Sequence, residues 1–111
     1  MTKAIAVAFI NEEVKEAFDE LKEGKFEDKE LHKQIQKAID DLSENPKNGI
    51  KIKRKLWPSV YVQEYQITNL WKYDLPKAWR LIYTIEESDI KIMSIILEWF
   101  DHEAYERRFG C

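Results

Sequence analysis

The first half of the chain shows two apolar periods in succession. Residues 3–9 alternate, with Ile5, Val7 and Phe9 on one face, which predicts a strand. Asn11 is a favourable N-cap residue, and apolar side chains then recur at helical spacing as far as Gly24. This pattern predicts a helix that ends at Gly24, because glycine readily adopts the backbone conformation that terminates a helix.

A second helix is predicted after a short connection. Asp28 is expected to cap it, and Asn45-Pro46 is expected to end it. Two helices joined this closely should form an antiparallel hairpin, and its apolar face needs a sheet to cover because short helices are not stable alone. The apolar stripe of the second helix consists of Leu31, Ile35, Ala38, Ile39 and Leu42.

The second half of the chain is predicted to form strands. Alternation predicts strands over residues 50–56 and 67–74, while residues 60–66 fit either extended chain or a short helical turn. A long hairpin follows: residues 78–85 alternate, residues 86–89 form a polar turn, and residues 90–99 are almost wholly apolar, as in a strand buried on both faces. We expect this hairpin to be the spine of the sheet, followed by a short helix or turn over residues 101–109.

The order of these elements predicts an α+β fold. An N-terminal strand and a helical hairpin should pack on one face of a twisted, mainly antiparallel sheet of four or five strands. The other face of the sheet is expected to be partly open. At 111 residues, the chain is expected to form a single domain over residues 1–111.

Composition narrows the class of protein. Hydrophobic content of 44% and aromatic content of 13% indicate a folded globule. We expect a cytoplasmic protein with no membrane span, because no apolar run is long enough and no signal peptide is recognisable. The single cysteine, Cys111, leaves no internal disulfide. Without a Cys/His cluster or a glycine-rich phosphate loop, no metal or other cofactor is expected.

Charge is distributed unevenly along the chain. The net charge of −3 argues against a dedicated nucleic-acid binder. Residues 1–48 carry 8 basic and 12 acidic side chains, whereas residues 49–111 carry 10 and 9. A local basic patch can bind phosphate even on an acidic molecule. The basic excess is concentrated in Lys51, Lys53, Arg54 and Lys55.

A second group of polar residues surrounds the long hairpin. Arg80 is the only basic residue on its first strand. If the chain has a site, we expect it here, where this arginine could meet the polar cluster beyond the second strand. That cluster contains Asp101, His102, Tyr105, Arg107 and Arg108.

These features together resemble the RelE/ParE superfamily of toxins from bacterial and archaeal toxin–antitoxin systems. The likeness rests on a basic strand before a central meander, the strand sequence WRLIY at residues 79–83, the Ile-rich strand after it and a His-x-x-Tyr ending. It covers nearly the whole chain. The RelE-like mRNA-interferase branch is favoured, which implies a toxin that inhibits translation by cutting mRNA on the ribosome and that binds a cognate antitoxin.

The resemblance also implies site residues. Arg80 would clamp the transition state, and His102 and Tyr105 would move the proton or stack on a base. The reaction needs no metal, because a ribose 2′-hydroxyl attacks the adjacent phosphate and preplaced cations stabilise the charge that builds up. The phosphate-binding cations would be Lys51, Lys53, Arg54 and Lys55.

Two departures from the pattern support an alternative function. The chain is acidic overall, which weakens the case for ribosome binding. Asp101 and Glu103 flank His102 where many endonuclease members carry arginine or lysine. The alternative is a non-nucleolytic RelE/ParE-fold binding protein, either gyrase-inhibitor-like or a degenerate solitary member. An antitoxin would cover the apolar seam of the helical hairpin or the open sheet face, and homodimer formation is left open.

Each candidate residue also has an ordinary structural interpretation. The lysines fit the solvated face of an edge strand, where they block unwanted pairing. Arg80 fits an ion pair with Glu64 or Asp74. His102 fits a surface position, Tyr105 fits a lid on the core, and the tryptophans fit packing roles better than a stacking platform for RNA.

Overall fold

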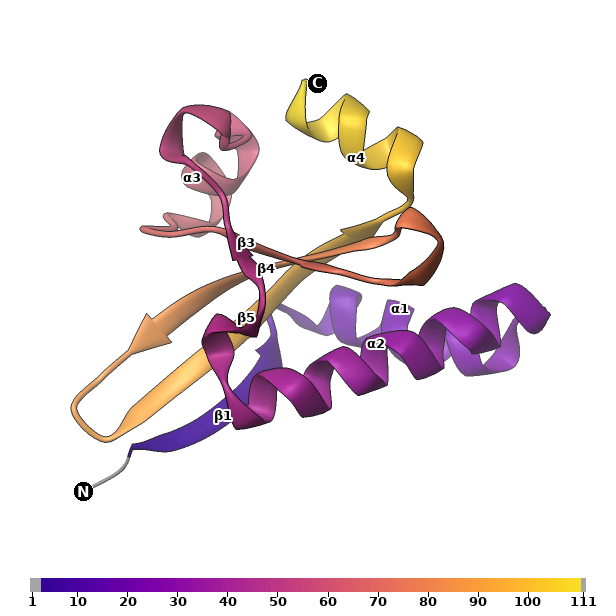
Figure 1. Ribbon diagram of the computed structural model, residues 1–111, viewed down its shortest axis with the longest axis horizontal. Coiled ribbons are helices and arrows are strands. Elements are labelled where there is room, and N and C mark those ends of the chain that lie inside the picture. Colours follow the sequence, from indigo (N-terminus) through magenta and orange to yellow (C-terminus); the bar gives the residue numbers. More distant parts are fainter. Residues whose placement is uncertain (1–2, 111) are drawn as a thin grey trace.

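The computed structural model describes residues 3–110, so Cys111 lies outside the described part of the chain. Its sheet has five strands in the order β1-β5-β4-β3-β2 (Figure 1). Strand β1 runs parallel to β5, and every other pair of neighbours is antiparallel. The bounds are β1 Ala4–Phe9, α1 Glu12–Glu20, α2 Phe26–Glu44, β2 Ile50–Lys51, α3 Ser59–Tyr65, β3 Trp71–Asp74, β4 Arg80–Glu87, β5 Lys91–Phe100 and α4 His102–Phe109.

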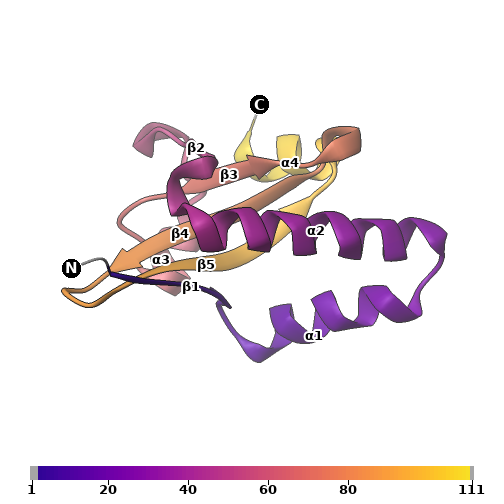
Figure 2. The same cartoon turned by 60° about the horizontal axis from the view of Figure 1, so that its bottom comes forward.

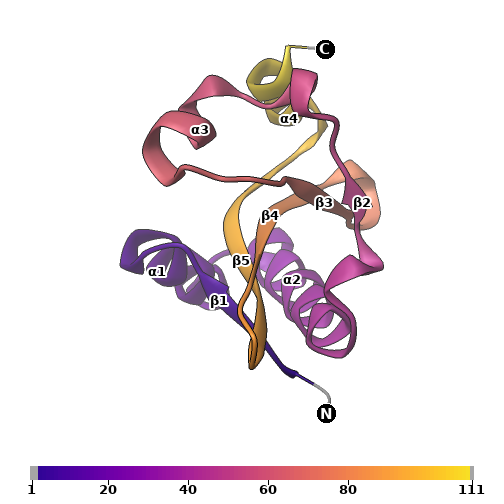
Figure 3. The same ribbon diagram turned by 90° about the vertical axis from the view of Figure 1, so that its left-hand side faces the viewer.

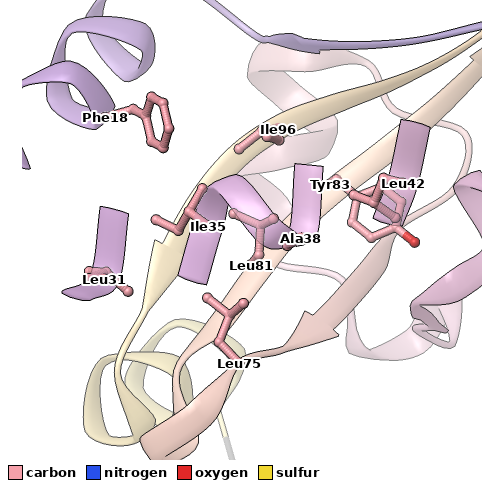
Figure 4. Close-up of a cluster of buried hydrophobic side chains, with 9 residues drawn as sticks. All are labelled: Phe18, Leu31, Ile35, Ala38, Leu42, Leu75, Leu81, Tyr83 and Ile96. Carbon is pink, nitrogen blue, oxygen red and sulfur yellow. The ribbon is translucent and has the colours of Figure 1, made fainter. Parts of the chain in front are cut away.

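The helical hairpin covers one face of the sheet, as predicted. Helix α2 runs across β4 and β5 (Figure 2), and its apolar stripe meets Leu81 and Tyr83 of β4 and Ile96 of β5 in a first core (Figure 4). The side chain of Asn11 caps α1 by accepting a hydrogen bond from the Val14 amide at 2.9 Å. The predicted α+β fold, with an N-terminal strand and helices on a mainly antiparallel sheet, is confirmed.

The second face of the sheet, which was predicted to be partly open, carries two short helices and a second core. Helices α3 and α4 lie on this side, away from the helical hairpin (Figure 3). They cover a second core, in which Tyr61 of α3 and Phe109 of α4 pack with strand and loop residues. Residues 60–66 fitted either extended chain or a helical turn, and the structure places a short helix there. The remaining buried members of this core are Ile52, Ile67, Leu70, Ile82 and Leu97.

The prediction that Asp28 caps the second helix is wrong. Helix α2 begins at Phe26, with Lys25 at the N-cap position. The carboxylate of Asp28 still accepts a hydrogen bond from the Lys25 backbone amide at 3.2 Å, now from the third position of the helix. The acidic residue therefore satisfies a backbone donor at the helix start from within the first turn.

The predicted strand over residues 50–56 is also wrong. Only Ile50–Lys51 pairs with β3, and a 3-10 turn at Arg54–Leu56 follows. Buried Ile52 makes one further strand-like bond, from its amide to the Leu70 carbonyl at 2.8 Å. The Trp57 indole then folds back and donates to the Ile52 carbonyl at 2.9 Å. This contact turns the chain away from the sheet.

Strand β3 is shorter than predicted because Asn69 replaces backbone pairing with its side chain. The Asn69 side-chain nitrogen Nδ2 donates to the Ile85 backbone carbonyl, and the side-chain oxygen Oδ1 accepts from the Ile85 backbone amide, each at 2.8 Å. The Thr84 hydroxyl donates to the Asn69 carbonyl at 2.7 Å. Regular pairing with β4 therefore starts only at Trp71, opposite Tyr83.

A bulge in β5 changes which residues face the second core. Ile82 pairs with Glu98 and Tyr83 pairs with Ile96, so Leu97 has no direct partner on β4. An extra residue of this kind shifts the alternation of side chains by one. Leu97 and Glu98 consequently both face the side of α3 and α4, and Phe100 follows on the same side, opposite Arg80.

Candidate functional site

Arg80 lies at the start of β4, in a cluster with Lys72, Asp74 and Tyr105 that we call the Arg80 cluster. Antiparallel pairing places Asp74 directly opposite Arg80, and the arginine Nε lies 3.1 Å from Asp74 Oδ1. Lys72 Nζ lies 3.5 Å from the same oxygen. The Arg80 guanidinium carbon and Lys72 Nζ lie 5.5 Å and 5.6 Å from the centroid of the Tyr105 ring. One carboxylate and one aromatic ring thus hold two cations together.

The Arg80 side chain is largely withdrawn from solvent. It is 19% exposed, and its Nε is fully buried without a well-aligned hydrogen bond despite the ion pair with Asp74. Its Nη1 donates to the Trp79 carbonyl at 3.3 Å. The alternative interpretation of Arg80 as a partner of Asp74 is therefore confirmed.

Tyr105 is positioned by helix α4. Asp101 caps this helix by accepting a hydrogen bond from the Ala104 amide at 2.9 Å. The Tyr105 ring stacks on Phe109, which is buried in the second core, with 4.5 Å between the ring centroids. The tyrosine thus joins the Arg80 cluster to the core, as a lid on the core would.

His102 has a different environment at the exposed start of α4. Its side chain is 59% exposed, and its Nε2 lies 2.5 Å from Glu106 Oε1, one turn along the same helix. Lys72 and Arg80 share their ion pair with Asp74, whereas the ion pair of His102 lies within α4. Of the two predicted proton-transfer groups, Tyr105 lies against the Arg80 guanidinium, whereas His102 is paired with Glu106.

Lys51, Lys53, Arg54 and Lys55, which we call the basic segment, lie at the β2 edge and are all exposed. The Arg54 guanidinium lies over the Trp57 ring, 5.7 Å from its centroid. Among the described residues, none of the four cations forms an ion pair. Together with Trp57 and Thr68, three of them line an open pocket of about 410 Å³; these are Lys51, Lys53 and Arg54.

Strand register separates Lys51 from Arg80. Lys51 pairs with Trp71, whereas Arg80 pairs with Asp74, three positions further along β3. Residues an odd number of positions apart on one strand point to opposite faces. Lys51 therefore lies on the face of α1 and α2, and Arg80 lies on the face of α3 and α4.

Lys72 is the cluster member that sequence reasoning missed. Lys72 and Asp74 are two positions apart on β3, so their side chains lie on the same face of the sheet. The turn at Pro76–Ala78 brings both residues alongside β4. That pairing could have been anticipated from the short connection between the two strands.

Neither a metal site nor a membrane span is found within residues 3–110. No group of three or more His, Cys, Asp or Glu side chains is arranged to hold a metal ion. No helix within this range combines the length and apolar character needed to cross a bilayer.

The mixed five-stranded sheet with a helical hairpin on one face is the α+β architecture that the resemblance implied. The family model for the ParE toxin of the type II toxin–antitoxin system, parDE, matches residues 10–97. The chain therefore belongs to the ParE toxin family. No curated protein and no solved structure gives a significant match.

Family membership supports part of what the sequence predicted. A ParE toxin implies a cognate antitoxin as partner. The matched range includes the basic segment and Arg80 and ends before His102 and Tyr105. The finer assignments stay predictions: the mRNA-interferase branch, the ribosome as partner, the homodimer and the role of each site residue.

Proposed function

We propose that this ParE-family toxin acts by binding a protein target, in the manner of a gyrase inhibitor, and not by cutting mRNA. The observation that carries the proposal is that several predicted cleavage residues are already paired with carboxylates or lie on opposite faces of the sheet. Arg80 is paired with Asp74, His102 is paired with Glu106, and Lys51 lies on the opposite face of the sheet from Arg80.

The state of Arg80 supports this proposal most directly. Catalysis of phosphoryl chemistry needs cations aimed at the charge that develops on the phosphorane. The Asp74 carboxylate is paired with Arg80 and Lys72, and it would repel a phosphate brought to the same guanidinium. An ion pair at this position stabilises the β3–β4 connection instead.

Two assays on the purified toxin separate the mechanisms. The first measures supercoiling of relaxed plasmid by DNA gyrase, and the second maps mRNA 5′ ends in a reconstituted translation reaction. We expect dose-dependent inhibition of supercoiling and no new mRNA ends. New ends that depend on the ribosome, without inhibition of gyrase, would overturn the proposal.

One observation favours the mRNA endonuclease as a second candidate. Lys72, Arg80 and Tyr105 place two cations around one phenol ring, which is the type of residue set that metal-free RNA cleavage uses. On this candidate, Arg80→Ala and Tyr105→Phe should each abolish mRNA cleavage. The matched variant Lys37→Gln, at an exposed position of α2, should retain it.

A further inference from the structure

An open pocket of about 560 Å³ lies between α3 and α4, on the second face of the sheet. Its walls include Ser59 and Val60 of α3, Phe100 at the end of β5, and Ala104, Arg107 and Arg108 of α4. No member of the Arg80 cluster or of the basic segment lines it. The pocket is therefore a separate feature from the candidate site described above.

Arg108 is held in place at this pocket. Its Nη2 lies 3.3 Å from Glu98 Oε2, and Glu98 reaches this face because of the bulge at Leu97. The guanidinium carbon lies 5.6 Å from the Phe100 ring centroid and 5.9 Å from that of Tyr61. An arginine fixed by a carboxylate and two rings presents its remaining N–H donors in a defined direction.

Arg107 is the uncompensated charge of the pocket. Its side chain is exposed, and it forms no ion pair with any residue between positions 3 and 110. Ala104 lies one turn earlier on the same wall, and its small side chain leaves room beside the guanidinium. Arg107 is thus free to contact an anion that enters the pocket.

The balance of charge and apolar surface indicates what kind of anion fits. Glu98 offsets Arg108, so the pocket carries one net positive charge from Arg107. A nucleic acid would find more uncompensated cations at the basic segment. A single carboxylate matches the arginine fork. The apolar walls formed by Val60, Phe100 and Ala104 suit hydrophobic side chains on either side of it.

We propose that the α3–α4 pocket binds a glutamate or aspartate side chain on an apolar segment of a protein partner. Arg107 contacts the carboxylate, and Arg108 together with the Ser59 hydroxyl orients it. Ala104, Arg107 and Arg108 all lie beyond residue 97, where the family match ends. The pocket is therefore built partly by a segment outside the matched range, and it adds a recognition site to the proposed target-binding function.

A titration followed by NMR tests this inference without gyrase or ribosomes. The probe is an N-acetylated, C-amidated pentapeptide of sequence GLELG, and the matched control is GLQLG. We expect GLELG to shift the backbone amides of Val60, Ala104 and Arg107, and GLQLG to bind about tenfold more weakly or worse. Arg107→Gln should weaken GLELG binding to a similar degree, Arg107→Lys should weaken it less, and Lys37→Gln should leave it unchanged.

Several results would overturn the inference. These are equal binding of the two peptides, shifts confined to other surfaces, or unchanged affinity in Arg107→Gln. Tighter binding of inorganic phosphate or of a single-stranded oligonucleotide at the same amides would show that the pocket recognises a phosphate and not a carboxylate, and this would also overturn the inference. None of these outcomes bears on gyrase inhibition, so failure here is distinguishable from failure of the proposed function.

Discussion

Tyr83 of β4 ties the sheet to the segment that follows α2. Its side chain is fully buried, and its hydroxyl donates to the Pro46 carbonyl at 2.7 Å and accepts from the Gly49 amide at 3.1 Å. A Cβ atom added at Gly49 would lie 2.4 Å from the Tyr83 hydroxyl oxygen, so glycine permits this approach. One phenol thereby satisfies two backbone groups on the way to β2.

The first prediction concerns this hydroxyl. Tyr83→Phe should lower the free energy of unfolding by roughly 1–3 kcal/mol, because it leaves a carbonyl and an amide without their partner in a buried place. Urea denaturation measures the change. Tyr65→Phe is the matched control, since the Tyr65 side chain is only half-buried. This control should lower the free energy of unfolding by a clearly smaller amount. Equal losses in the two variants would contradict this account of Tyr83.

His32 of α2 connects the two helices of the hairpin. Its ring stacks on Phe18 of α1 with 4.2 Å between centroids, and its Nε2 is buried without a hydrogen-bond partner among residues 3–110. Burial, with a smaller contribution from Lys22, lowers the pKa of His32, and Asp19 acts weakly in the other direction. Burial at this position of the hairpin therefore disfavours the protonated imidazole.

A lowered pKa makes the stability of the protein depend on pH. Below the ordinary histidine pKa of about 6.5, the unfolded chain binds a proton that the folded chain resists, so His32 should reduce stability as pH falls. Urea unfolding at about pH 7.5 and about pH 5.5 measures this loss. His32→Leu should flatten the pH dependence, whereas His102→Gln should retain it because His102 is exposed. A flat profile for the unmodified protein would refute the role of His32.

At the scale of elements, α4 depends on its cap. Asp101→Ala removes the acceptor for the Ala104 amide and should cost about 1 kcal/mol of stability. Tyr105 and Phe109 belong to this helix and pack toward the second core. The loss of stability should therefore appear in the global unfolding transition, and the Tyr105 ring should become more mobile in NMR spectra. Asp89→Ala, at an exposed turn position, is the control and should change neither. Loss confined to local fraying would show that α4 is not coupled to the second core.

At the scale of the whole molecule, charge is divided between faces. Residues 12–44 carry 12 acidic and 6 basic side chains, and they form the helical hairpin on the first face. The basic segment lies at the β2 edge, and Arg107 stands on the second face. The molecule therefore presents acidic and basic surfaces on different sides, and each suits a partner of the opposite charge.

Sequence periodicity predicted most of the fold and less of the site. Alternation and helical spacing identified the hairpin β4–β5 and the pair α1–α2, because each buries one continuous apolar face. The basic segment alternates like a strand, but a 3-10 turn at Arg54–Leu56 and the hydrogen bond from the Trp57 indole to the Ile52 carbonyl turn it away from the sheet. The separation of Lys51 from Arg80 depends on the register in which β2 pairs with β3. Only two residues of β2 are paired, which is too few for the alternation of apolar and polar side chains to specify that register.

Induced expression in a bacterial host, with growth and transcript 5′ ends recorded together, separates target binding from mRNA cleavage. The unmodified protein is compared with Arg80→Ala and with the control Lys37→Gln. We expect growth arrest without new mRNA ends, and arrest that persists in Lys37→Gln. New mRNA ends that disappear in Arg80→Ala would contradict this expectation and establish the Arg80 cluster as a ribonuclease site.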